Sequence, residues 1–213
     1  MSSPTLTLLH AALAPLGLTI LGHCPATPED GLGEGTLVLI GPDEPAFWPI
    51  FHASPEAQDG EIDPLDRWSR RVLTKIATNT GGVPYFPFGG EPYRPFYTWA
   101  LRTGRVWTSP IGFLVHETAG LFVSFRGAIL LPITAAAQAA QSPCDTCTDH
   151  PCKTSCPVGA FDDGYDVAAC KSYLATPSGA DCMTTGCRAR QACPVGQGNR
   201  RPAQAAFHMK AFL

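Results

Sequence analysis

The sequence predicts a mixed α/β (α+β) protein that ends in a small module held together by cysteines. Two apolar strand-like runs and one long amphipathic helix lie in the first eighty or so residues, which indicates a sheet-and-helix core. Eight of the nine cysteines lie between residues 144 and 193. At 213 residues the chain is long enough for a core plus such a module. We therefore expect one domain over residues 1–135 and a second over 136–213, which ends in a helix at Pro202–Phe212.

The first fifty residues predict a helix and two strands. Apolar residues at helical spacing predict a helix over Leu6–Leu16, and Leu18–Leu21 then favours a short strand. Thr36–Ile40 is apolar without alternation, as in a strand that is covered on both faces. Ala46–Phe51 is expected to form a short helix, and residues 53–60 a polar loop.

The clearest helix begins at Asp63 and Pro64, which suit the N-cap and the first helical position. Its apolar residues share one face, as expected of a helix that packs on a core, and they are Leu65, Trp68, Val72 and Ile76. Residues 67–142 carry eight basic side chains against two acidic ones. The arginines of this helix are expected to form its solvated face and to pair with the acidic N-terminal third, with an anionic ligand as the alternative.

A stretch from Val83 to Phe96 is rich in proline and glycine and carries five aromatic side chains. Such a loop either plugs an edge of the core or lines the pocket of a flat ligand, and taken alone the pattern favours the plug. A helix is predicted over Pro95–Arg102. Further on, Ile111–His116 and Leu121–Leu131 are predicted to pair as a hairpin that turns at residues 117–120.

The cysteines carry the clearest functional signal. Cys144, Cys147, Cys152 and Cys156 are separated by two, four and three residues, and Pro157 follows the last of them. Bacterial ferredoxins hold [4Fe–4S] clusters with the run C-x2-C-x2-C-x3-C-P, whose fourth cysteine ligates the second cluster. The middle gap here is two residues longer, so we expect the loop to bulge at Thr148–Pro151. The tail repeats the ending Cys-Pro-Val-Gly at residues 193–196, which indicates two related half-sites and hence two [4Fe–4S] clusters.

Three other uses of clustered cysteines fit less well. Zinc sites take two C-x-x-C pairs or mixed cysteine and histidine sets, and only Cys144 and Cys147 have that spacing, with His150 as an extra ligand. Disulfide frameworks belong to secreted and usually smaller proteins, and reactive cysteines rarely come eight together. Cys24 lies far from the others, so we expect it to be a buried free thiol.

Composition restricts the class of protein and of partner. No run approaches the ~18–20 apolar residues of a membrane span, so we expect no membrane association. The apolar N-terminus has no basic residue before Arg67, unlike a signal peptide, so a cytoplasmic location is expected, where thiols stay reduced. A net charge of −3 makes nucleic acid an unfavourable partner.

The segment Ser109–Pro132 contains the pattern His-x-x-x-Gly followed by aromatics and Arg-Gly. It resembles the corrinoid-handling domain shared by epoxyqueuosine reductases and the cobalamin-processing protein of the methylmalonic aciduria type C family. The loop Phe86-Pro87-Phe88 also resembles the cobalamin-processing branch, whereas Cys170–Leu174 and Gly186-Cys187 resemble the reductase branch. The resemblance implies a flavin-reductase-like (nitroreductase-like) sheet-and-helix domain with a ferredoxin-like iron–sulfur module.

The same resemblance implies the ligands. One cluster would use Cys144, Cys147, Cys152 and Cys193, and the other Cys156, Cys170, Cys182 and Cys187. The last three cysteines are spaced more widely than in the reductases, and Arg190 stands near the place of their middle cysteine. Cobalamin, or alternatively FMN, would be bound by Phe86, Phe88, His116 and Arg126. The helical-repeat tail that the reductases use for tRNA is missing, and no residue matches their catalytic acid.

Two functions follow from these features. In the first, electrons from a redox partner protein pass through two clusters to a corrinoid, or to a flavin, in the N-terminal domain, and the protein is an oxidoreductase of a small substrate. In the second, the protein is a ferredoxin-like electron-transfer protein without substrate chemistry of its own. No motif identifies the substrate, the catalytic residues or the oligomeric state.

Overall fold

The computed structural model describes residues 3–213 and confirms a mixed α/β protein with antiparallel sheets. The chain forms two compact units, of which the first contains the residues up to Val106 together with Ser124–Ala140 and the second contains Trp107–Val123 together with Gln141–Leu213. This division differs from the predicted boundary at residue 135. The reason is a shared hydrophobic cluster, because Ile111, Val115 and Leu121 pack with Cys152, Phe161 and Cys193. Within residues 3–213, none of the helices has the length and apolar character to cross a bilayer.

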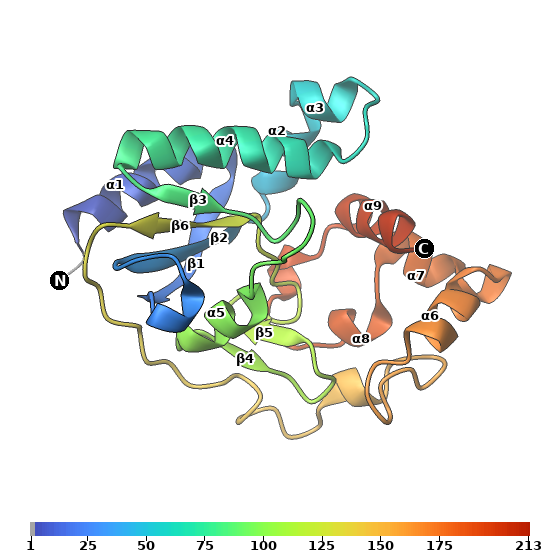
Figure 1. The fold of residues 1–213 in the computed structure, drawn as a ribbon. Coiled ribbons are helices and arrows are strands. Elements are labelled where there is room, and N and C mark those ends of the chain that lie inside the picture. Colours follow the sequence, from blue (N-terminus) through green and yellow to red (C-terminus); the bar gives the residue numbers. More distant parts are fainter. Residues whose placement is uncertain (1–2) are drawn as a thin grey trace. The chain divides into compact units, whose positions relative to one another are not determined.

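The first unit contains a four-stranded antiparallel sheet in the order β1-β2-β6-β3 (Figure 1). Its strands are β1 (Leu18–Pro25), β2 (Thr36–Pro42), β3 (Val83–Tyr85) and β6 (Gly127–Leu131). The first two strands were both predicted, although each extends further than its apolar run. β2 is buried from Thr36 to Gly41, as an unbroken apolar run predicts for a strand covered on both faces.

Helices cover both faces of this sheet (Figure 1). α1 (Pro4–Leu13) and α4 (Pro64–Thr80) lie on one face, and α5 (Phe96–Arg102) lies against the other. The remaining helices of the unit are short, and they are η1 (Ala14–Leu16), η2 (Pro28–Asp30), α2 (Phe47–His52) and α3 (Pro55–Gln58). α3 occupies the predicted polar loop, so that part of the prediction is wrong. Asp63 precedes α4 as expected, but its side chain makes no capping hydrogen bond.

The predicted hairpin between Ile111–His116 and Leu121–Leu131 is wrong. β5 (Leu114–His116) pairs instead with β4 (Val106–Thr108) in a two-stranded sheet, and β6 pairs with β2 and β3. Of the predicted hairpin only the turn is present, as an isolated antiparallel bridge between His116 and Gly120. The ladder stops there because the apolar side chains that follow serve two different cores. Leu121 joins the cysteine cluster of the second unit, whereas Phe125 packs on Phe96 in the first.

Besides β5 and most of β4, the regular elements of the second unit are helices. Its helices are η3 (Pro151–Lys153), α6 (Val167–Leu174), η4 (Pro177–Gly179), α7 (Ala180–Thr185), α8 (Arg188–Gln191), η5 (Gln197–Asn199) and α9 (Pro202–Phe212). α9 has the predicted bounds and packs against α7. Three aromatic rings, those of Phe113, Phe161 and Tyr165, lie with their centroids 4.9 to 5.1 Å apart. This unit therefore combines a small apolar core with long irregular loops.

Asp30 provides a test of what stabilises the first unit. Its carboxylate, 4% exposed, accepts hydrogen bonds from Arg102 at 2.8 and 2.9 Å, from Trp99 at 2.8 Å and from the Thr27 N–H at 2.8 Å. Burial raises the pKa of Asp30, but these donors lower it by more, to about 2. Asp30→Asn should therefore cost about 2 kcal/mol of unfolding free energy at neutral pH.

The stabilisation that Asp30 contributes to the folded protein depends on pH. Because the carboxyl pKa is lower in the folded protein, its stabilisation is complete above the unfolded value of about 4 and disappears as pH falls through about 2. Urea unfolding followed by tryptophan fluorescence measures both effects. Asp59→Asn is the control, because Asp59 pairs with Arg67 on the surface with 37% of its side chain exposed. Equal losses in the two variants would refute the anchoring role of Asp30.

Candidate metal centre

Four of the predicted ligands line one cavity of the second unit. They are Cys144, Cys147 and Cys152 from one loop and Cys193 from a distant part of the chain. The cavity holds about 320 Å³ of space between its atoms, part of it open to solvent. Its other lining residues are mostly apolar, and they are Ser109, Val115, Leu121, Pro143, His150, Pro151, Pro194 and Val195. The arrangement therefore gives four thiols on the wall of a largely apolar chamber.

Turns in the loop Cys144–Cys152 bring its three thiols to the cavity. The Cys147 N–H donates to the carbonyl of Cys144 at 3.3 Å, which closes a tight turn between these two cysteines. His150 then adopts φ 39° and ψ 55°, in the left-handed region, and directs the chain into η3, which carries Cys152. The long gap thus contains a left-handed residue, His150, within the segment where the spacing predicts a bulge.

Two glycines fit the Cys193–Gly196 ending against the turn at residues 117–120. A Cβ on Gly120 would lie 2.1 Å from the carbonyl oxygen of Val195 and 3.3 Å from Sγ of Cys193. A Cβ on Gly196 would lie 2.2 Å from the carbonyl oxygen of Ala119. Both glycines also have left-handed φ angles, 59° and 75°. This close backbone contact holds Cys193 at the cavity, far in sequence from the other three ligands.

His116, predicted to bind an organic cofactor, closes the same turn. Its ring is buried, and Nδ1 accepts hydrogen bonds from the backbone N–H groups of Thr118 at 3.2 Å and Ala119 at 3.1 Å. An acceptor Nδ1 belongs to a neutral ring with its proton on Nε2. His116 therefore has a structural role in the second unit, and it supports the backbone that contacts the Cys193–Gly196 ending.

The thiols of this group disfavour one another's charge. Burial raises the pKa of Cys144, and the neighbouring Cys193 raises it further. Burial likewise raises the pKa of Cys152, followed by the effects of Cys144, Cys193 and Cys147. Four thiolates this close together need compensating positive charge, which iron would supply while keeping each thiol deprotonated.

Three of the other four predicted ligands, Cys156, Cys170 and Cys187, affect the pKa of Tyr165. Burial raises the pKa of this phenol most, and then a hydrogen bond to Cys170 and the charges of Cys170, Cys187 and Cys156 raise it further. Cys156 also raises the pKa of Cys182, where burial is again the main cause. Since charges act on a pKa only at short range, these interactions place Cys156, Cys170, Cys182 and Cys187 near one another.

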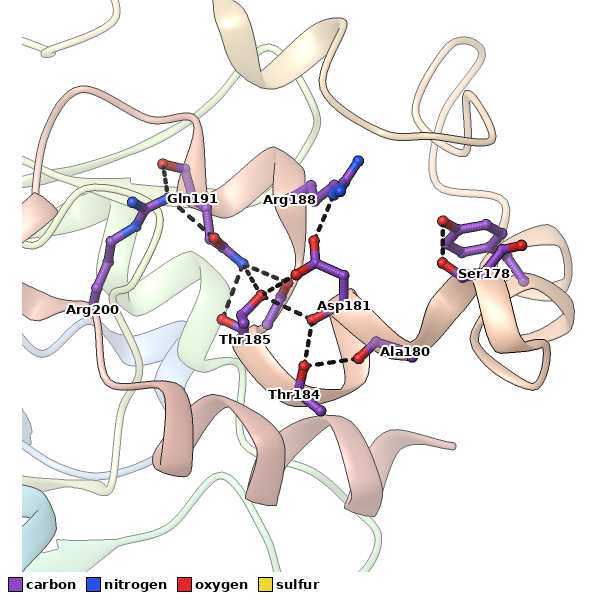
Figure 2. Close-up of polar contacts among 10 residues, drawn as sticks. Ser178, Ala180, Asp181, Thr184, Thr185, Arg188, Gln191 and Arg200 are labelled. Atoms are coloured by element: carbon purple, nitrogen blue, oxygen red, sulfur yellow. Dashed lines mark hydrogen bonds and ion pairs between the residues drawn. The ribbon is translucent and has the colours of Figure 1, made fainter.

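A hydrogen-bond network holds the gap between Cys182 and Cys187 (Figure 2). The side-chain amide of Gln191 donates to the carbonyl oxygens of Thr185 at 3.0 Å and Gly186 at 2.6 Å. Arg200 in turn donates to Gln191, to its backbone carbonyl at 2.9 Å and to Oε1 at 3.1 Å. At the protein surface, Arg188 pairs with Asp181 at 2.8 Å. These contacts fix the four-residue gap that distinguishes this cysteine pair from the reductase spacing.

Arg190, which the resemblance places near a cysteine of the reductases, makes contacts within the second unit. Its Nε donates to the carbonyl of Leu121 at 2.6 Å, and its guanidinium lies 5.8 Å from the ring centroid of Phe122. Burial lowers the pKa of Arg190. The arginine therefore joins α8 to Leu121 and Phe122, and Leu121 belongs to the hydrophobic cluster of this unit.

No three histidine, cysteine, aspartate or glutamate side chains within residues 3–213 are arranged to hold a single metal ion. A zinc ion bound by thiolates at 2.3 Å needs sulfur atoms about 3.8 Å apart. In a cubic cluster each thiolate binds a different iron, so the sulfur atoms stand further apart. Four thiols in each group match the four thiolates that a [4Fe–4S] cluster binds, one for each iron.

In the first unit, three of the four residues predicted to bind an organic cofactor lie together. The ring centroids of Phe86 and Phe88 are 5.2 Å apart, and the guanidinium of Arg70 lies 4.9 and 5.4 Å from them. Arg126 lies just before β6 rather than in the middle of a strand, and its Nη1 is 3.7 Å from a carboxylate oxygen of Asp66. A Cβ on the adjacent Gly127 would lie 3.4 Å from the Phe86 ring, so the arginine and the aromatic loop are neighbours.

These contacts leave one N–H of the Arg126 guanidinium without a hydrogen-bond partner. Burial lowers its pKa, with Asp66 opposing the effect, and its Nε is buried without a hydrogen-bond partner. An unpaired buried donor is costly, so this N–H marks a point where a ligand acceptor would be stabilised. The structure also adds Arg70 and Asp66 to the group. Arg70 is exposed on α4, as the sequence predicts for the solvated face, and Arg67 and Arg71 pair as expected with Asp59 and Glu56.

Cys24 lies apart from both cysteine groups in sequence and has a separate environment. Its thiol is free and buried in the first unit, with Sγ 3.8 Å from the carbonyl of Trp99. The prediction of a buried free thiol is confirmed. It serves below as the control among the cysteines.

Comparisons of the chain with protein-family models, with curated proteins and with solved structures found no match.

Proposed function

We propose that the second unit binds two [4Fe–4S] clusters and that the protein transfers single electrons. The proposal is carried by the grouping of eight cysteines into two sets of four. One set lines a cavity, and the members of the other are linked by short-range charge effects on one another and on Tyr165. The sets cross along the chain, since Cys193 belongs with Cys144 while Cys156 belongs with Cys187. Crossed sharing of this kind is how ferredoxins place two clusters in one small fold.

The residues around the first set suit electron transfer. A [4Fe–4S] cluster supplies a one-electron couple when bound there. The side chains of Val115, Leu121 and Val195 keep the wall of the cavity apolar, which limits water and strengthens the few polar interactions with sulfur. Cys144 and Cys147 are half-buried, so a redox partner protein can approach this set closely.

Anaerobic purification followed by iron, sulfide, zinc, cobalt and flavin analysis tests the proposal. We expect about eight irons and about eight sulfides per chain, with the broad visible absorption of iron–sulfur protein. Stoichiometric zinc without sulfide, or cysteines recovered as disulfides under these conditions, would contradict it.

A second component of the proposed function concerns the first unit. The unpaired Nε of Arg126, next to Phe86 and Phe88, favours a flat ligand that is edged with hydrogen-bond acceptors. Cobalamin, which the sequence resemblance implies, has amide carbonyls at its edge, and FMN has ring carbonyls and a phosphate that the two arginines could bind. With such a cofactor, we propose that the protein is a reductase of a small substrate. Without one, it is a ferredoxin-like electron-transfer protein.

Phe88→Ala distinguishes these alternatives. If cobalamin binds, its visible spectrum should shift towards the base-off form on addition of the protein, and Phe88→Ala should weaken binding about tenfold through the lost ring contact. Tyr93→Ala is the control, because Tyr93 belongs to the same loop but is 64% exposed. A parallel titration with FMN, followed by quenching of its fluorescence, covers the other ligand. No spectral change with either compound would leave only the electron-transfer protein.

A further inference from the structure

Two polar side chains in the first cysteine cavity have no hydrogen-bond partner. Ser109 is 5% exposed, and its buried Oγ contacts no acceptor or donor. The buried Nδ1 of His150 also lacks a partner. Both residues line the cavity with Cys144, Cys147, Cys152 and Cys193. A buried polar group left unsatisfied costs about 1–3 kcal/mol, and folded proteins rarely keep two in one cavity without a ligand for them.

The backbone at His150 gives a second and independent indication. A left-handed conformation at a residue other than glycine is uncommon and costs of order 1–3 kcal/mol. His150 adopts it inside the longer gap between Cys147 and Cys152, in the segment by which this loop exceeds the ferredoxin run. The longer gap therefore does more than connect two ligands. It places an imidazole on the wall of the cysteine cavity.

We propose that His150 and Ser109 donate hydrogen bonds to the sulfur atoms of the cluster held by Cys144, Cys147, Cys152 and Cys193, and so raise its reduction potential. The inference rests on the proposed function. Reduction adds negative charge to the cluster and its thiolates, and N–H and O–H donors stabilise that charge more than they stabilise the oxidised form. The apolar remainder of the wall makes each donor more effective, because little water competes for the sulfur atoms.

The chemistry of the site favours hydrogen bonding over direct ligation by His150. Four thiolates already provide one ligand for each iron of a [4Fe–4S] cube. Ligation of iron by His150 would also not account for Ser109, which lines the same cavity from a different part of the chain. Direct coordination by the imidazole is therefore the competing outcome of the test.

The test uses the full chain, purified without oxygen, as Ser109→Ala, His150→Phe and the double variant. Iron content and a redox titration followed by electron paramagnetic resonance are measured on each. Thr148→Ala is the matched control, because Thr148 lies in the same loop with an exposed side chain outside the cavity. We expect about eight irons in every variant, unchanged potentials in Thr148→Ala, and a lower potential for one of the two clusters in Ser109→Ala, His150→Phe and the double variant. The ratio of reduced to oxidised cluster at a fixed potential should fall about tenfold per donor, which corresponds to 59 mV for one electron.

The outcomes separate the inference from the function on which it rests. Full iron content with unchanged potentials in Ser109→Ala and His150→Phe would overturn the donor role and leave the two clusters in place. Loss of about four irons from His150→Phe, together with nitrogen coupling to iron in the wild-type resonance spectrum, would show ligation and overturn the donor role. Wild-type protein without iron would overturn both proposals.

Discussion

Cys193→Ala should reduce the iron content from about eight to about four per chain. Cys193 is 8% exposed and lines the cavity with Cys144, Cys147 and Cys152, although it follows the second set in sequence. Its loss leaves three thiolates for four irons, and an incomplete site exposed to solvent holds a cluster poorly. The other set, Cys156, Cys170, Cys182 and Cys187, keeps all four cysteines, so its cluster should remain.

Double variants identify which cluster is lost. Cys144→Ala added to Cys193→Ala should remove no further iron, because both cysteines serve the same cavity. Cys170→Ala added to Cys193→Ala should remove nearly all remaining iron, because Cys170 belongs to the other set. Cys24→Ala, in a buried thiol of the first unit, should change nothing. The opposite pattern in the two double variants would show that the crossed assignment is wrong.

Removal of iron should disorder the cysteine loops of the second unit while the sheet of the first unit stays folded. The hydrophobic cluster of the second unit includes Cys152 and Cys193, so under the proposed function two of its buried members are also iron ligands. The loops Cys144–Cys156 and Cys182–Cys193 contain only short helical segments. Their order must come largely from ligand bonds, as in small domains that fold around metal.

Hydrogen exchange of the holo and apo proteins measures this dependence. Amide protection in both cysteine loops should fall to nearly that of unfolded peptide in the apo protein. Amides of β1, β2 and β6 provide the internal control, because these strands pair with one another inside the first unit. Unchanged protection of the loops without iron would mean that the aromatic trio Phe113, Phe161 and Tyr165 suffices to order them.

Elements with strong local signals were predictable from the sequence. Proline at the first helical position marks the start of both α4 and α9. An amphipathic repeat then continues α4, and an unbroken apolar run defines β2. The edge strand β3 was hidden by its proline and by the glycine-rich sequence around it. The division of the chain was also hidden, because residues 107–123 pack with a segment that follows them by thirty residues or more.

The candidate sites show the same contrast between local and long-range information. Cysteine spacing and the repeated Cys-Pro-Val-Gly ending indicate two clusters without any coordinates, and the resemblance to the reductases implies which cysteines serve each one. Ser109 carries no such signal, since a lone serine before a proline becomes significant only when its hydroxyl is buried without a partner. Asp66 and Arg70 are four residues apart on α4, a spacing that places them on one face, but only the fold reveals that this face meets Phe86 and Arg126.

The most direct measurement is anomalous X-ray scattering at the iron absorption edge from crystals grown without oxygen. We expect two separate iron peaks, each of about four atoms. One should be enclosed by Cys144, Cys147, Cys152 and Cys193, and the other by Cys156, Cys170, Cys182 and Cys187. A single peak at the zinc edge, or eight cysteines with no metal scattering between them, would contradict it.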